Sequence, residues 1–217
     1  PQMAVIPSGT TNDFARALKI PRDDLVAAAR LVLQGKTRKM DIGKAGDKYF
    51  MNIAASGSLT ELTYGVPSEW KSILGYTAYL LKGAEMFPKI SNNKMRLTYD
   101  KGVYEGDLSM FFLGMTNSIG GWEQVMPDAQ LSDGLFQLIV VKTSNPIDIL
   151  RLMAMAINGN HVKDPNIIYT KTRSLKVELL DNSHSKKKIA VNLDGDIGGY
   201  LPMSFTNLQQ HIEFFVG

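Results

Sequence analysis

The sequence contains no cysteine among its 217 residues, and this excludes disulfides and thiolate metal sites. A reducing compartment is the natural expectation, so we predict a cytoplasmic protein. No apolar run reaches the roughly 18 residues that a membrane-spanning helix needs. A Walker A sequence (GxxxxGK[ST]) and a serine in G-x-S-x-G context are also absent. The known loops of P-loop enzymes and of α/β-hydrolases are therefore excluded.

Charge is nearly balanced, with 24 Lys and Arg against 21 Asp and Glu, which gives a net charge of +3. Hydrophobic residues make up 44% of the chain, which is ordinary for a soluble globular protein. No basic stripe interleaved with aromatic residues is present, so we expect no nucleic-acid partner. The mild positive charge is compatible with phosphate-bearing ligands or with an anionic membrane surface.

The pattern of apolar residues changes near residue 36. Before it, a strand over 3–6 and two helices predict an α/β arrangement. After it, strand-like segments dominate, and two helices interrupt them. The predicted strands cover 39–43, 49–54, 95–99, 103–115, 135–141, 167–170, 175–180, 189–193, 201–206 and 212–216, and the predicted helices cover 68–87 and 147–157. We therefore predict an α+β protein whose larger part is β-rich.

The segment VIPSGTTNDFARAL, residues 5–18, connects a strand to a helix through small hydroxyl residues and a glycine. One interpretation is turn chemistry, in which Asn12 caps the helix that begins at Asp13. The other is a phosphate site. Gly9 would allow the backbone N–H groups to approach an anion, and Thr10 would donate its hydroxyl near a helix N-terminus. The residues alone leave both interpretations open.

Two carboxylates lie in the segment VNLDGD, at Asp194 and Asp196. They follow a predicted strand and are separated by a glycine, so they occupy an open turn at the end of the strand. Carboxylates this close repel each other unless they share a cation or a proton. This suits a general base assisted by magnesium, and a plain Asp-Gly turn is the alternative.

A second acidic loop, PDAQLSDGL, contains Asp128 and Asp133. Magnesium prefers oxygen ligands in octahedral geometry, which a carboxylate and backbone carbonyls on a sharp loop supply. An Asx-turn at 132–134 that closes a hairpin is the alternative.

Four segments, taken in order, resemble the bacterial diacylglycerol kinase family of soluble lipid kinases, which shares a superfamily with the NAD kinases. They are GTTNDFARAL, MNIAASG, NSIGGWEQVMPDAQLSDGLFQLIVV and VNLDGD. The resemblance covers nearly the whole chain. It implies a two-domain kinase in which residues 1–36 are the remnant of an α/β nucleotide-binding domain. Residues 37–217 would form a β-rich, sandwich-like C-terminal domain. Because the chain begins within a strand and not at a methionine, we interpret it as a fragment.

The resemblance also implies site residues, with ATP and Mg²⁺ as cofactors. Gly9, Thr10, Asn12 and Asp13 would face ATP. Asp196 stands where the family usually has Glu and would be the base, and Asp194 would bind metal or orient the base. Further metal ligands would be Asp133, the carbonyls of Gln130 and Leu135, and Asp128.

A diacylglycerol-like lipid alcohol is the expected substrate, and ATP and a peripheral membrane surface, on the inner face, are the other expected partners. A homodimer is compatible with the sequence. The motifs do not separate diacylglycerol from a sphingoid base or phosphatidylglycerol. A non-catalytic lipid-binding module remains the alternative of a different class.

Overall fold

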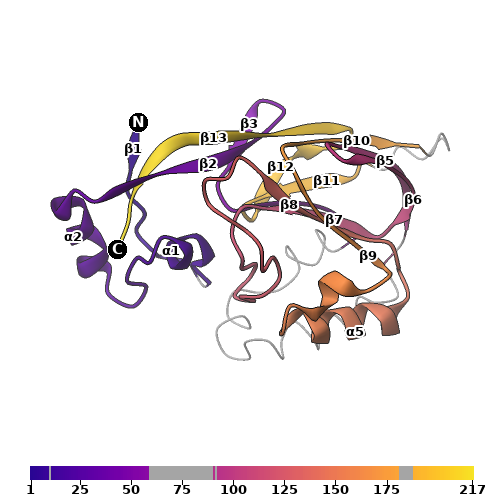
Figure 1. Cartoon of the computed structure of the whole chain (residues 1–217), viewed down its shortest axis with the longest axis horizontal. Coiled ribbons are helices and arrows are strands. Elements are labelled where there is room, and N and C mark those ends of the chain that lie inside the picture. Colours follow the sequence, from indigo (N-terminus) through magenta and orange to yellow (C-terminus); the bar gives the residue numbers. More distant parts are fainter. Residues whose placement is uncertain (10, 59–89, 91, 181–187) are drawn as a thin grey trace.

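The structure, a computed structural model, describes residues 1–9, 11–58, 90, 92–180 and 188–217. It is elongated, with a small lobe that contains both termini and a larger lobe made of two packed sheets (Figure 1). The predicted helix over 68–87 lies outside the described residues. Among the described residues, no helix is long and apolar enough to cross a membrane.

The first sheet has the strand order β3-β2-β13-β10-β5-β6, and all of these neighbours are antiparallel. A short additional strand, β1, pairs with β13 in parallel. The bounds are Gln2–Met3 (β1), Thr37–Ala45 (β2), Lys48–Phe50 (β3), Asn93–Tyr99 (β5), Gly102–Leu108 (β6), Ser174–Leu179 (β10) and Met203–Phe215 (β13).

The second sheet has the strand order β12-β11-β4-β7-β8-β9 and is antiparallel throughout. Its bounds are Ile53–Gly57 (β4), Met110–Gly114 (β7), Phe136–Val141 (β8), Ile167–Thr172 (β9), Ala190–Leu193 (β11) and Asp196–Tyr200 (β12). The predicted β-rich, sandwich-like fold is confirmed by these two sheets, with the core between them.

The chain crosses from one sheet to the other where the sequence predicts continuous strands. The predicted strand over 103–115 is two strands, because Ser109 interrupts it between β6 in the first sheet and β7 in the second. Ser109 is fully buried, and its backbone N–H and its hydroxyl both donate to the carbonyl of Val141. The predicted strand over 49–54 is divided in the same way, into β3 and β4.

Aromatic side chains fill the core between the sheets. The Phe50 ring stacks on Phe136 at 5.6 Å between centroids, and Phe111 meets Phe205 edge-on at 6.0 Å. The outer face of the second sheet is partly covered by α5 (Pro146–Ala156) and by a 3₁₀ helix, η2 (Asn160–Lys163). Asn145 caps α5, because its side chain accepts the N–H of Ile147.

The small lobe consists of α1 (Asp13–Ala17), α2 (Leu25–Gln34), β1 and the adjoining ends of β2 and β13 (Figure 1). Asp24 caps α2 by accepting the N–H of Ala27, and Gly35 ends it in the left-handed conformation at φ 68°. The lobe has its own apolar core, in which Phe14 lies edge-on to the fully buried Phe214. The long strands β2 and β13 connect this core to the sandwich.

Candidate functional site

The candidate site lies where the end of the second sheet meets helix α1. The register pairs Ile53, the first residue of β4, with Gly114, the last residue of β7. It also pairs Leu193 with Ala54 on one side and with Asp196 on the other. The start of β4, the end of β7 and the β11–β12 turn therefore share one end of the sheet.

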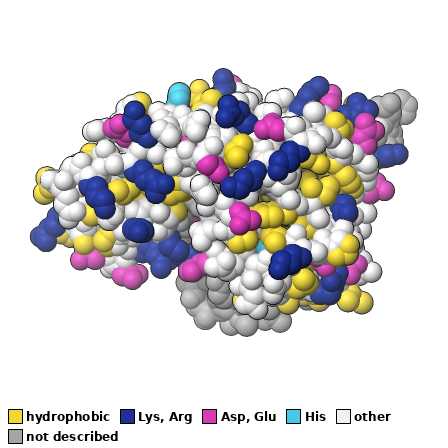
Figure 2. All heavy atoms as spheres, viewed as in Figure 1, with side chains coloured by type: hydrophobic (Ala, Val, Ile, Leu, Met, Phe, Trp, Pro, Cys, Tyr) yellow, Lys and Arg dark blue, Asp and Glu magenta, His cyan; other side chains and the backbone are white. Residues whose placement is uncertain are grey.

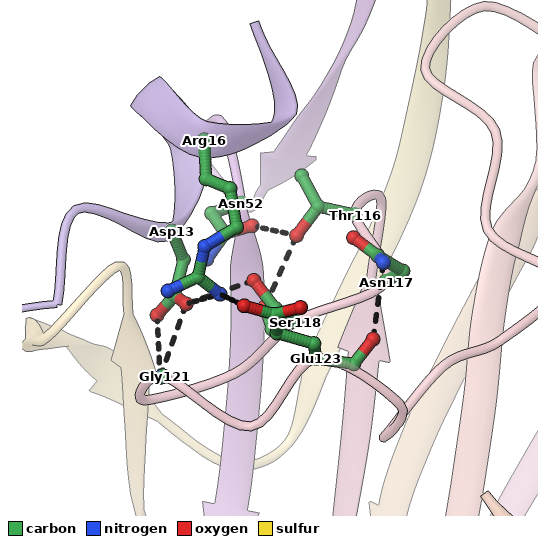
Figure 3. Close-up of polar contacts among 8 residues, drawn as sticks. All are labelled: Asp13, Arg16, Asn52, Thr116, Asn117, Ser118, Gly121 and Glu123. Carbon is green, nitrogen blue, oxygen red and sulfur yellow. Dashed lines mark hydrogen bonds and ion pairs between the residues drawn. The ribbon is translucent and has the colours of Figure 1, made fainter. Parts of the chain in front are cut away.

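Asp13 connects helix α1 to this end of the sheet. Its side chain is buried, and Oδ1 accepts the hydroxyl of Ser118 at 2.8 Å and the N–H of Gly121 at 3.0 Å (Figure 3). Arg16 lies 3.5 Å from the same carboxylate and 3.4 Å from Glu123. The Asp13 carboxylate therefore binds the loop that follows β7.

The segment that precedes Asp13 is a tight turn. Asn12 is the residue before helix α1 and adopts the left-handed conformation at φ 49°. Its side chain accepts the N–H of Gly9 at 2.9 Å and donates to the carbonyl of Gly9 at 2.8 Å, so it makes no capping bond to the helix. The expectation that the Asn12 side chain caps the helix is wrong, since its amide closes the turn instead. Thr10 lies outside the described residues.

The buried Thr116 and the half-buried Asn52 continue the hydrogen bonding from Ser118 toward the β11–β12 turn. The hydroxyl of Thr116, which is 3% exposed, donates to the Asn52 side-chain oxygen and lies 3.1 Å from the Ser118 carbonyl. Figure 3 shows the side chains of Asn52, Thr116 and Ser118 close to one another and beside Asp13.

Asp194 accepts three backbone N–H groups that precede and begin β4. The donors are Met51 at 2.6 Å, Asn52 at 2.9 Å and Ile53 at 2.8 Å, and both carboxylate oxygens are used. Burial raises the pKa of Asp194, although these three donors favour the ionised form. Its left-handed backbone, at φ 52°, turns the chain between β11 and β12. This geometry favours an orienting role for Asp194 over metal binding.

Asp196 differs from Asp194 in its surroundings. Both residues are exposed, but the side chain of Asp196 forms no hydrogen bond or ion pair with the residues that the structure describes. The turn that presents it is closed by Asn192, whose side chain accepts the N–H of Gly195 at 2.9 Å. A carboxylate without a protein donor keeps its basic lone pairs available for a proton from a ligand.

The acidic loop at 127–135 is engaged with protein donors. Asp133 accepts the Lys171 ammonium at 3.0 Å and the N–H of Leu135 at 3.1 Å. The second bond closes an Asx-turn over 133–135, one residue later than the predicted turn at 132–134. The backbone carbonyl of Asp128 accepts the Gln137 amide, and Gln130 is exposed. Within the described ranges no group of three or more His, Asp or Glu is placed to bind a metal. Asp133 is thus paired with protein donors, and the metal-binding role of Asp128, Gln130, Asp133 and Leu135 stays a prediction.

Asp41 was not among the predicted site residues, yet it fixes this acidic loop. It is 2% exposed and accepts the N–H of Gly134 at 2.6 Å and that of Gln210 at 2.8 Å. Its own N–H donates to the carbonyl of Leu131. Burial raises the pKa of the Asp41 carboxyl, and its two N–H donors oppose that shift.

Sequence reasoning missed Asn52, Thr116 and Ser118 as individual residues. All three lie in or beside the segments MNIAASG and NSIGGWEQV, which carry part of the family resemblance. The signal was therefore present as motifs, but polar residues at strand ends have no periodicity that identifies their partners.

Comparison with known proteins connects this site to a family. The family model described as "YegS C-terminal NAD kinase beta sandwich-like domain" matches residues 67–216. The model described as "Diacylglycerol kinase catalytic domain" matches residues 1–45, so that domain is only partly present.

Relatives with curated names support the same assignment. The chain is 46% identical over 212 residues to a diacylglycerol kinase of Bacillus subtilis (strain 168), covering 98% of this chain and 68% of that protein. It is 43% identical over 215 residues to a diacylglycerol kinase of Staphylococcus aureus (strain bovine RF122 / ET3-1), covering 99% and 66%. The chain thus spans about two thirds of the length of these relatives.

A solved structure shares the fold. The crystal structure of a diacylglycerol kinase from Bacillus anthracis str. Sterne matches with a TM-score of 0.75 at 24% identity, covering 100% of this chain and 69% of that one. The matches to both family models and to the two curated relatives show that this chain belongs to the bacterial diacylglycerol kinase family.

Proposed function

We propose that the full-length protein transfers the γ-phosphate of ATP to the hydroxyl of diacylglycerol, giving phosphatidic acid. One observation carries this proposal beyond the family membership. Hydrogen bonds run without interruption from Asp13, beside the ATP-facing segment, to the turn that presents Asp196. A phosphate segment and a base must share one site for phosphoryl transfer, because reacting atoms have to come within about 3–3.5 Å.

In the proposed reaction, the lipid hydroxyl oxygen attacks the γ-phosphorus in line with the leaving oxygen of ADP. A new phosphorus–oxygen bond forms as the bond to ADP breaks, and the Asp196 carboxylate accepts the hydroxyl proton. The exposed position of Asp196 supports this role, since no described residue competes for its oxygens. Magnesium that accompanies ATP would neutralise charge on the phosphates.

Gly9, Thr10, Asn12 and Asp13 would form the phosphate-facing segment, with Asn12 closing its turn around Gly9. The charge of the small lobe favours an anionic ligand. Lys and Arg side chains gather over this lobe in Figure 2, and acidic side chains are sparser there. The exposed cationic residues are Lys19, Arg22, Arg30, Lys36, Arg38 and Lys39. Such a surface attracts phosphates and anionic lipids at moderate salt.

The test is transfer of radiolabelled phosphate from ATP by the full-length protein to a panel of lipid alcohols: diacylglycerol, a sphingoid base and phosphatidylglycerol. We expect diacylglycerol to be the best acceptor. Asp196→Asn should lower kcat by roughly 10²-fold or more, the usual size of general-base assistance. Asp107→Asn, which changes an exposed carboxylate on β6, is the matched control and should retain full activity.

Each outcome of this assay decides a separate point. Transfer to another alcohol in preference would keep the kinase and change its substrate. No transfer to any lipid would favour the non-catalytic module. Near-wild-type turnover in Asp196→Asn would reject the assignment of the base.

A further inference from the structure

The polar residues between the two halves of the site have no assigned role. Asn52 and Thr116 lie between the Asp13 segment and the β11–β12 turn, and neither belongs to the predicted phosphate segment or base. Thr116 is almost completely buried two residues after β7, where an apolar side chain such as valine would fill the same volume. A buried hydroxyl is retained at a cost unless its hydrogen bonds are made.

We propose that Thr116 and Asn52 are positioning residues that fix the β11–β12 turn, and with it Asp196, relative to the Asp13 segment. The expected effect on kcat rests on the proposed function. The hydrogen bonds from which we argue do not depend on that function.

The first half of the connection runs from Asp13 to Thr116. Oδ1 of Asp13 accepts the Ser118 hydroxyl at 2.8 Å, and the backbone carbonyl of the same serine lies 3.1 Å from the Thr116 hydroxyl. Ser118 is 1% exposed, so water does not compete for these bonds. A shift of Asp13 therefore moves Ser118 and its carbonyl together.

The second half runs from Thr116 to Asp194. The Thr116 hydroxyl donates to the side-chain oxygen of Asn52, and the backbone N–H of Asn52 donates to Asp194 Oδ1 at 2.9 Å. The neighbouring N–H groups of Met51 and Ile53 bind the same carboxylate. Asp194 is only two residues from Asp196, so the orientation of the turn depends on these donors.

The Thr116 hydroxyl contacts both halves of the connection, Ser118 on the Asp13 side and Asn52 on the Asp194 side. A hydroxyl has one proton, and here it lies between two acceptors, the Asn52 side chain and the Ser118 carbonyl. Removing the hydroxyl takes away the one donor that these two acceptors share. The two segments would then move independently by small amounts, and near-attack geometry tolerates little displacement.

Thr116→Val in the full-length protein tests this proposal. We expect kcat for diacylglycerol phosphorylation to fall about tenfold while KM for ATP changes little, and Thr116→Ser to restore kcat. The matched control is Thr172→Val at the last residue of β9, which is two strands away from β7 in the same sheet. Thr172 is also fully buried and its hydroxyl also donates to a backbone carbonyl, that of Ser174, but it lies outside the site. It should lower stability without lowering kcat.

A double variant separates positioning from general destabilisation. If Thr116 acts through Asp196, then Thr116→Val should reduce kcat little further when Asp196→Asn is already present. Full additivity of the two losses would overturn the proposal, as would wild-type kcat in Thr116→Val.

A measurement without lipid keeps the inference independent of the proposed function. Amide hydrogen exchange at Gly121, which binds Asp13, and at Asn52 and Ile53, which bind Asp194, should accelerate together in Thr116→Val. We expect a factor of about 3–10, the effect of losing one ordinary hydrogen bond. No change in Thr172→Val at these amides is expected. If the full-length protein transfers no phosphate but this exchange pattern appears, the proposed function fails and the coupling stands. Unchanged exchange at either end would overturn the coupling.

Discussion

Asp194 and Asp196 show how two residues of one type, two positions apart, acquire different roles. Sequence reasoning placed both in one catalytic pair, because both lie on an open turn. In the structure, the oxygens of Asp194 are used by three backbone N–H groups, whereas Asp196 faces no donor from the described residues. The distinction depends on residues 51–53, about 140 positions earlier in the chain, and no local pattern contains it.

Asp194→Asn should therefore act on stability. An amide offers one oxygen in place of two, and its NH₂ group would face the N–H of Met51 or of Ile53. We expect the free energy of unfolding to fall by about 1 kcal/mol, because Asp194 is exposed and water can reach part of the lost contact. Urea denaturation of the full-length variant measures it.

Asp196→Asn is the natural comparison, because it makes the same chemical change at a carboxylate that no described residue binds. Its unfolding midpoint should match that of the wild type while its kcat falls. Equal stability of the two variants would mean that the three N–H bonds to Asp194 contribute little, and the orienting role would lose its support.

At the scale of elements, the pattern of apolar residues predicted the β-rich part well, because alternating and continuous apolar runs are local features of the sequence. The crossing at Ser109 was missed even though the pattern changes there. β6 is largely exposed, whereas all five residues of β7 are buried or nearly so. Strand prediction responds to β-propensity, which is high on both sides of Ser109, and not to which sheet a strand joins.

For β13 the prediction made the opposite error and divided one strand into two. Two strands, over 201–206 and 212–216, were predicted where a single strand runs over Met203–Phe215. The intervening Gln-Gln-His residues form an irregularity at which the register with β2 shifts between Leu208 and Ile212. Gln210 adopts φ 49° there, which local propensity does not anticipate.

The 3₁₀ helix η2 supplies a pH-dependent contact to the loop that follows the site. His161 is 4% exposed, and its Nε2 lies 2.9 Å from the carbonyl of Val125. Burial lowers the pKa of His161 below its ordinary value of 6.5. The unfolded chain then binds a proton near pH 6.5 while the folded chain binds it only at lower pH. Stability must therefore fall as the pH drops below about 6.5.

We expect His161→Gln to flatten this dependence between pH 7 and 5, since glutamine does not titrate and can still donate to Val125. His211→Gln, at an exposed position on β13, is the control and should retain the wild-type profile. The measurement is the urea midpoint at each pH. Parallel profiles for His161→Gln and the wild type would show that another group controls acid stability.

At the scale of the whole molecule, two of the contacts between the small lobe and the sandwich are especially extensive. One is the polar connection through Asp13, and the other is the long β2–β13 pair, which continues from one lobe into the other (Figure 1). The division of the chain at residue 36 stays a prediction. Since β2 begins at Thr37 and pairs with β13 along both lobes, the change in local pattern coincides with the start of this shared ribbon. Contacts between distant segments, such as Asp41 with Gln210, could not be predicted from one sequence.

Asp41 provides the last prediction, because it joins three segments where the lobes meet. Its carboxylate accepts N–H groups from the acidic loop, at Gly134, and from the β13 irregularity, at Gln210, while the residue itself lies on β2. Asp41→Asn leaves one of these buried donors facing an NH₂ group, so we expect a loss of about 2–4 kcal/mol in the free energy of unfolding. Asp100→Asn is the control that separates the effect of burial on stability from the effect of losing a hydrogen bond. Asp100 also accepts two backbone N–H groups, from Arg173 and Ser174, but it is exposed on a turn, and water can replace a lost partner there. Its loss should be about 1 kcal/mol or less. If the two variants lose equal stability in urea denaturation, burial at the junction of the lobes does not set the strength of this contact.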